Sequence, residues 1–85
     1  MESAVLAELR RIAQVDLEYQ GPVEPALRLK EDLQLDSMAM IVVAVGLEDR
    51  FRVKLEEGDA GAILTVADLV RLVERRVAEA GSAPR

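Results

Sequence analysis

Apolar side chains recur at helical spacing in three separate segments of the chain. In residues 3–15 they include Val5, Leu9 and Ile12, which are three or four residues apart, as on one face of an amphipathic helix. Residues 37–51 and the segment that follows Thr65 repeat this spacing. No segment shows a marked alternation of apolar and polar residues, which would indicate a strand. The pattern therefore predicts an all-α fold.

The stretch between the first two helical segments contains residues that interrupt a helix. Gly21, Pro22 and Pro25 follow soon after Leu17, so residues 18–35 are predicted to form a long loop. Apolar residues within this loop indicate that it packs against the core. They are Val23, Leu27, Leu29 and Leu33.

Two glycines mark the stretch between the second and third helical segments. Gly58 and Gly61 disfavour helix there, so residues 53–64 are predicted to form only a short, mobile helix. The predicted architecture is a small helical bundle of three main helices plus one short helix.

The starts of the three main helices carry residues that favour N-capping. Ser3 precedes the first helix, and Asp36 precedes a second helix expected to run from Ser37 to about residue 51. Thr65 and Asp68 have the spacing of a capping box with Asp in place of Glu. These positions predict where each helix begins.

The same periodicity predicts which side of each helix is buried. The expected core residues of the first helix are Val5, Leu6, Leu9, Ile12 and Ala13, and those of the last helix are Val66, Leu69, Val70, Val73 and Val77. The second helix has two apolar stripes. We expect Ile41, Ala44, Leu47 and Phe51 to face the core and Met38, Val42 and Val45 to face outward. Small residues such as Gly46 are interpreted as sites of close helix packing rather than as an opening for cargo.

Length and composition limit the function classes. With 85 residues, we expect one domain over residues 1–80 and a disordered tail over residues 81–85. The net charge of -5 argues against binding to nucleic acid. The absence of Cys and His excludes disulfides and a cysteine nucleophile, and we predict no metal site. No targeting signal and no membrane insertion are expected, so we expect a free-standing, cytoplasmic protein.

Ser37 stands between an acidic lead-in and ten uncharged residues. Its simplest role is that of a residue tolerated at a helix start. A serine nucleophile needs a neighbouring base, and no His is present to serve as one. A third role is acceptance of a phosphate-linked group, since the positive end of a helix favours an anion. Asp36 would then cap the helix and also help to hold a divalent cation during the transfer.

Three spaced motifs follow one another along the chain. They are EDLQLDSM, then Leu47, Glu48 and Asp49 with Phe51, and finally Ile63, Thr65 and Val66. This set resembles the acyl carrier protein family, whose pattern reads approximately E-D-L-G-x-D-S-L, L-E-x-x-F and I-x-T-V. The resemblance runs without a gap from Glu31 to about Val70.

The resemblance implies a role and a cofactor. Ser37 would carry 4'-phosphopantetheine, transferred from coenzyme A by a phosphopantetheinyl transferase with Mg²⁺. The thiol of this arm would hold acyl groups as thioesters, so a chain without cysteine would obtain its reactive sulfur from the cofactor. The chain itself would be a non-catalytic carrier, and its partners would be acyl-loading and acyl-processing enzymes such as synthases and transferases.

Several positions depart from the family pattern. Gln34 stands where the family usually has Gly, so the loop either avoids a positive φ or holds it under strain. Glu56, Gly58 and Gly61 are expected to loosen the short helix.

The outward positions of the second helix, often acidic in fatty-acid carriers, are here largely apolar. The expected partner-binding residues are Met38, Ala39, Val42, Val45, Glu48 and Asp49. We expect a monomer that meets its partners through a partly hydrophobic helix-in-groove contact with less electrostatic steering.

The cargo remains open between two classes. Leu35 before Asp36 favours acyl cargo in fatty-acid-like or polyketide-like biosynthesis. Met38 after the serine keeps an aminoacyl or D-alanyl carrier as an alternative. In a third alternative, outside the family, the chain is an unmodified helical interaction module that binds a partner, or itself, through Val42 and Val45.

Overall fold

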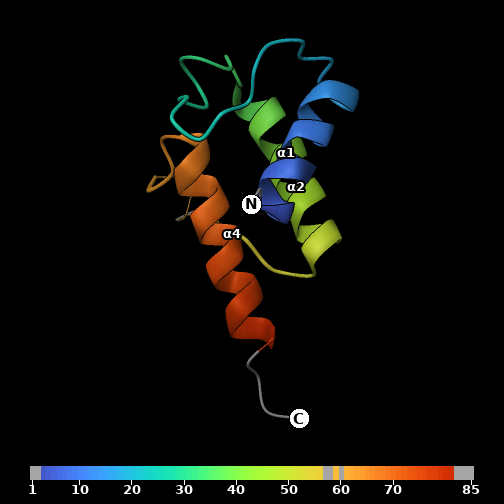
Figure 1. The fold of residues 1–85 in the computed structure, drawn as a ribbon, viewed down its shortest axis with the longest axis vertical. Coiled ribbons are helices and arrows are strands. Elements are labelled where there is room, and N and C mark those ends of the chain that lie inside the picture. The colour runs from blue at the N-terminus through green and yellow to red at the C-terminus, as the bar shows by residue number, and fades with distance from the viewer. Residues whose placement is uncertain (1–2, 57–58, 60, 82–85) are drawn as a thin grey trace.

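The computed structural model describes residues 3–56, 59 and 61–81. Its helices are α1 (Ala4–Val15), α2 (Ser37–Phe51) and α4 (Val66–Gly81), and within the described residues there is no strand, only an isolated bridge between Arg28 and Thr65. Figure 1 shows α1 and α2 side by side, with the longer α4 beside them. The molecule measures 41 × 29 × 21 Å. The all-α prediction is confirmed.

The helix starts agree with the predicted caps. The Ser3 hydroxyl accepts the N–H of Val5 at 3.1 Å. Thr65 and Asp68 form the reciprocal capping box, with the Asp68 N–H donated to the Thr65 hydroxyl and the Thr65 N–H to the Asp68 carboxylate, each at 3.1 Å. The N–H groups of Thr65 and Leu64 hold the pKa of Asp68 below its usual value. Short-range sequence signals therefore fix these helix boundaries.

Helices α1 and α4 present the predicted apolar faces to the core. All five residues expected from α1 are buried, and so are Val66, Leu69, Val70 and Val73 of α4, while Val77 packs partly against them. In both helices charged residues occupy the opposite side, so only one side of each helix can face the core.

The direction predicted for the core face of α2 is wrong in part. Ile41 is 57% exposed, whereas Val43, which was not predicted, is 1% exposed and Leu47 is fully buried. Phe51 is half-buried against the core. The residues from Ser37 to Leu47 carry no charge, so no polar side marks which way the helix faces. The buried line is set instead by Val43 and Leu47, which are four residues apart.

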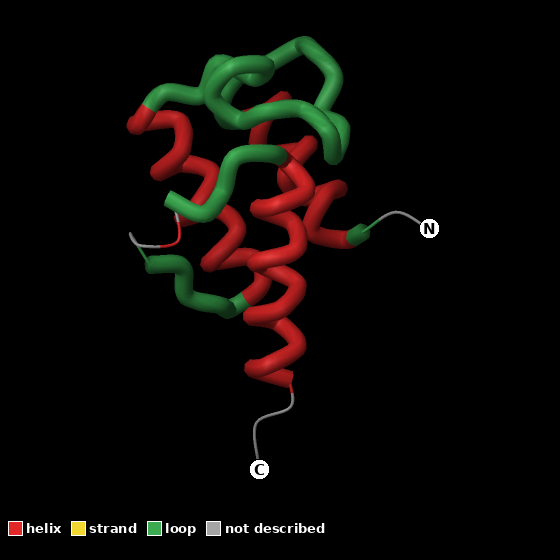
Figure 2. The backbone as a smooth tube through the Cα atoms, turned by 90° about the vertical axis from the view of Figure 1, so that its left-hand side faces the viewer, coloured by secondary structure: helices red, strands yellow, loops and turns green. Residues whose placement is uncertain are grey.

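The long loop is ordered by the core and by the start of α4. Val23, Leu29 and Leu33 are buried as predicted, and Leu27 is packed partly against them. The Leu29 N–H is donated to the Leu64 carbonyl at 3.0 Å, and the Val66 N–H to the Leu27 carbonyl at 2.8 Å. Figure 2 shows this loop crossing one end of the bundle, above the start of α2.

Gly46 allows α1 and α2 to approach each other closely. A Cβ at this position would lie 2.7 Å from Cδ1 of Ile12, a side chain that is fully buried. This geometry supports the interpretation of Gly46 as a packing residue.

Two predictions fall partly outside the described residues. The short third helix would include residues 57, 58 and 60, and most of the predicted tail comprises residues 82–85. The last helix itself extends to Gly81, one residue into that tail. None of the described helices combines the length and the hydrophobicity that a membrane-spanning segment requires.

Candidate functional site

Ser37 is the first residue of α2, and Asp36 is its N-cap. The Asp36 Oδ1 accepts the Ala39 N–H at 2.8 Å, and the Asp36 carbonyl accepts the Met40 N–H at 2.9 Å. The predicted cap is therefore confirmed. It holds the loop and the helix in a fixed relation on either side of the serine.

The Ser37 side chain is exposed, and the structure shows no hydrogen bond to it within the described residues. The N–H groups of Ser37 and Met38 likewise have no hydrogen-bond acceptor there. These groups form the positive end of the helix dipole. No basic side chain in the described part of the chain is hydrogen-bonded to the hydroxyl, so none is placed there to activate it as a nucleophile.

Gln34 has a φ of 59°, in the left-handed region. It is exposed, and it lies between Leu33 and Leu35, whose side chains are 3% and 5% exposed. The Leu35 N–H is donated to the Leu29 carbonyl at 3.0 Å. The two anchored leucines force Gln34 into a conformation that costs about 1 kcal/mol or more in a residue with a Cβ. Of the two possibilities expected for this position, the strained one is realised.

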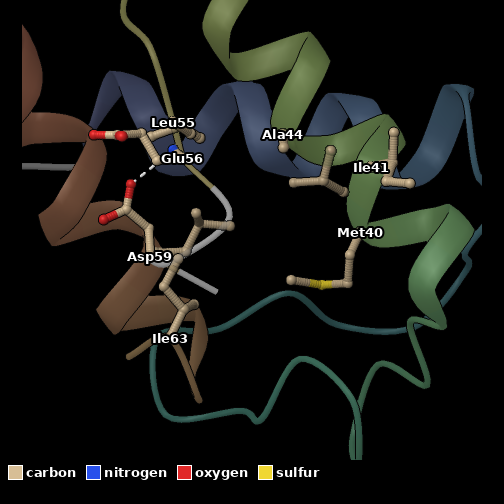
Figure 3. Close-up of a pocket in the computed structure, with 9 residues that line it drawn as sticks. Met40, Ile41, Ala44, Leu55, Glu56, Asp59 and Ile63 are labelled. Carbon is tan, nitrogen blue, oxygen red and sulfur yellow. Dashed lines mark hydrogen bonds between the residues drawn. The ribbon is translucent and has the colours of Figure 1, made fainter. Parts of the chain in front are cut away.

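An apolar pocket of about 200 Å³ lies between α2 and the segment that follows it. Figure 3 shows Met40, Ile41 and Ala44 of α2 on one side and Leu55 and Ile63 on the other. Sequence reasoning missed this pocket. The sequence did contain an indication of it. The apolar residues Leu55 and Ile63 flank a glycine-containing segment, and apolar residues at such positions indicate a contact with another part of the protein.

An ion pair between Arg76 and Asp59, which we call the charged clamp, holds one wall of this pocket. Arg76 of α4 donates to both carboxylate oxygens of Asp59, at 3.0 and 3.1 Å, and to the Lys54 carbonyl at 2.6 Å. The Glu56 N–H is donated to Asp59 at 2.8 Å. This hydrogen bond, followed by the Arg76 guanidinium, lowers the pKa of Asp59. The clamp therefore ties the segment after α2 to the middle of α4.

The residues predicted to bind partners fall into two groups. Met38 and Val45 are 69% and 56% exposed, and Asp49 is also exposed. By contrast, Ala39 and Val42 pack partly against the core. Glu48 is half-buried and accepts the Leu55 N–H at 2.6 Å, which ties it to the loop.

Ile41, which was predicted for the core, joins Met38 and Val45 on the exposed side of α2. We call Met38, Ile41 and Val45 the apolar stripe. The three residues are spaced along one side of the helix, and Asp49 continues the same line toward the end of α2.

No group of three or more acidic side chains that could hold a metal ion occurs in the described residues.

Comparison with known proteins decides the family. No protein-family model matches the chain. A curated protein from Rhodococcus erythropolis named acyl carrier protein is 31% identical over 87 residues, which cover 96% of this chain and 91% of that protein. The chain belongs to the acyl carrier protein family. A crystal structure of an acyl carrier protein from Thermotoga maritima superposes with a TM-score of 0.79, at 26% identity and 88% coverage of both chains.

These matches confirm the resemblance inferred from EDLQLDSM and the later motifs. They also show that the bundle has the acyl carrier protein fold. Within that fold, this acyl carrier protein family member combines an exposed serine at a helix start, a strained loop residue before it and an apolar pocket beside the same helix.

Proposed function

We propose that this protein is a carrier whose Ser37 bears 4'-phosphopantetheine derived from coenzyme A. The observation that carries the proposal is the exposed Ser37 at the first turn of α2, directly after the capping Asp36, in a member of the acyl carrier protein family. When bound, the arm supplies the thiol on which acyl groups are held as thioesters. The protein presents the arm and performs no catalysis itself.

The residues at the start of α2 fit a phosphodiester. The Ser37 and Met38 N–H groups lack acceptors within the described residues and lie at the positive end of the helix. An anion attached to Ser37 gains from both features, whereas the unmodified serine uses neither. The loop–helix junction is exposed, so a phosphopantetheinyl transferase can reach the hydroxyl.

Asp36 has a second role in the proposal. Only Oδ1 is engaged as the helix cap, and Oδ2 has no hydrogen-bond partner in the described part of the chain. This oxygen can contact the Mg²⁺ ion that accompanies the transferred phosphate, with the remaining ligands supplied by the transferase and the donor.

The pocket beside α2 favours acyl cargo. It is lined mainly by apolar side chains, including Met40, Ile41, Leu55 and Ile63. Hydrocarbon gains free energy on entering such a site. The lining also includes the carboxylates of Glu56 and Asp59, and Asp59 is already paired with Arg76. We therefore propose acyl intermediates of fatty-acid-like or polyketide-like biosynthesis as cargo.

The apolar stripe is the proposed surface for partner enzymes. Met38, Ile41 and Val45 are exposed next to Ser37, and Asp49 lies at the far end of the same side of α2. An apolar groove on an acyl-loading or acyl-processing enzyme would bury this stripe. Because the part of α2 nearest Ser37 carries no charge, hydrophobic burial contributes more to the contact than charge attraction.

Modification by a transferase tests the proposal. The protein is incubated with a phosphopantetheinyl transferase, coenzyme A and Mg²⁺, and its intact mass is measured. We expect the mass to increase by one arm, Ser3→Ala to behave like the native protein, and Ser37→Ala to gain nothing. An unchanged mass of the native protein, or a gain in Ser37→Ala, would contradict the proposal. Transfer from acyl and from aminoacyl donors then separates the two cargo classes.

A further inference from the structure

A second groove, of about 400 Å³, lies beside the start of α2. Two loop stretches, residues 17–20 and 33–36, form it together with Ala39. It differs from the apolar pocket in composition, because exposed polar side chains lie beside buried leucines. Its polar groups include the carboxamides of Gln20 and Gln34, and its apolar groups include Leu33 and Leu35.

Backbone strain is concentrated at this groove. Glu18 has a φ of 53° and Gln34 a φ of 59°, and both residues line the groove. In the described residues the only other non-glycine residue with a positive φ is Arg52, which forms the left-handed C-cap of α2 at the opposite end of that helix. Glycine would adopt these conformations without strain. A glutamine held there against this cost, three residues before the serine proposed to carry the arm, points to a use for its side chain.

The groove is chemically complementary to the neutral part of a pantetheine arm. Such an arm carries two amides, a hydroxyl, methyl groups and methylenes. The carboxamides of Gln20 and Gln34 can each donate to and accept from an amide, and no hydrogen bond within the described residues engages either of them. The leucines can contact the methyl and methylene groups.

Charge determines which part of the arm can enter. The carboxylates of Glu18 and Asp36 also line the groove, so an anionic phosphate is disfavoured inside it. The phosphate would remain at the positive end of α2 while the amide-containing part lies in the groove. The pocket next to Met40 and Ile41 offers few partners to amides, because its lining is mainly apolar.

We propose that the unloaded arm on Ser37 rests in this groove, with Gln34 and Gln20 binding its amides. The inference rests on the proposed function, since it requires the arm to be attached. It assigns to Gln34 a role in positioning the arm, which its strained backbone alone would not require.

The experiment compares apo and arm-bearing protein by nuclear magnetic resonance, after intact mass has shown complete modification. We expect shifts at the side-chain amides of Gln20 and Gln34 and at the backbone of residues 17–20, in addition to those near Ser37. Gln34→Gly removes the carboxamide and relieves the backbone strain. Loss of one hydrogen bond lowers the docking equilibrium constant about fivefold, so the docked population falls and the shifts at residues 17–20 should shrink with it.

Arg52→Gly is the matched control, because it relieves the same kind of strain at the far end of α2. It should leave the shifts at residues 17–20 unchanged. Shifts confined to residues 36–39 in the native protein, or an equal pattern in Gln34→Gly, would overturn the inference while leaving the modification of Ser37 intact. Failure of the mass to increase would instead overturn the proposed function and this inference together.

Discussion

Two substitutions of Asp36 separate its role as helix cap from its proposed role in contacting a cation. The Asp36 Oδ1 accepts the Ala39 N–H at 2.8 Å at the start of α2. Asp36→Asn keeps an oxygen acceptor in the same place and loses the charge, whereas Asp36→Ala loses both. Asp36 is exposed, so neither change disturbs the core.

The cap sets the expected loss of stability. Removal of an N-cap acceptor costs about 1 kcal/mol, which lowers the melting temperature of a domain of this size by about 4–8 °C. Asp36→Asn should lose only the interaction of the charge with the helix dipole, about 0.3 kcal/mol at moderate salt. Urea unfolding of the apo proteins, followed by circular dichroism, measures both free energies.

The rate of arm transfer should rank the two variants differently from their stability. If the Asp36 charge contacts the cation, both variants should be modified about tenfold or more slowly than the native protein, although Asn retains the fold. Equal destabilisation by Asn and Ala would refute the capping role. Modification of Asp36→Asn at the native rate would refute the role in cation binding.

Three further results follow from the structure. Leu47→Ala should lower the free energy of unfolding by about 2–5 kcal/mol, whereas Ile41→Ala should change it by less than about 0.5 kcal/mol, and urea unfolding would show a reversed order if α2 faced the other way. The Glu56 N–H and then Arg76 depress the pKa of Asp59 below its usual 3.8, so its stabilisation is present above that pH and is lost as the pH falls through the folded-state value. Asp59→Asn should therefore show a smaller loss of stability between about pH 4 and pH 2 than the native protein, and an unchanged acid profile would contradict this. Affinity for a partner enzyme should fall little as salt is raised, and a steep loss would indicate that charge dominates the contact.

The sequence predicted α1, α4 and the helix caps because local signals determine them. Charged residues on one side of α1 and α4 leave a single apolar face, and Ser3, Asp36 and Thr65 provide side-chain acceptors at the helix starts. The buried leucines of the long loop were also predictable, because leucine side chains in a folded protein are usually buried.

The direction of α2 and the pocket beside it could not be predicted in the same way. Residues 37–47 have no charged side to mark solvent, so the burial of Val43 and the exposure of Ile41 depend on how α1 packs against the helix. The pocket requires Leu55 and Ile63 to face α2 across a tertiary contact. For Gln34 the sequence left two backbone conformations, and the buried leucines on either side select the left-handed one.

Peptide mapping after treatment with a transferase tests the central claim most directly. Cleavage after Lys30 and Arg50 yields residues 31–50, a peptide in which Ser37 is the only hydroxyl-bearing side chain. We predict that the whole mass of one phosphopantetheine arm is found on this peptide and is localised to Ser37 by fragmentation. An unmodified peptide 31–50, or an arm found on any other peptide, would contradict the account.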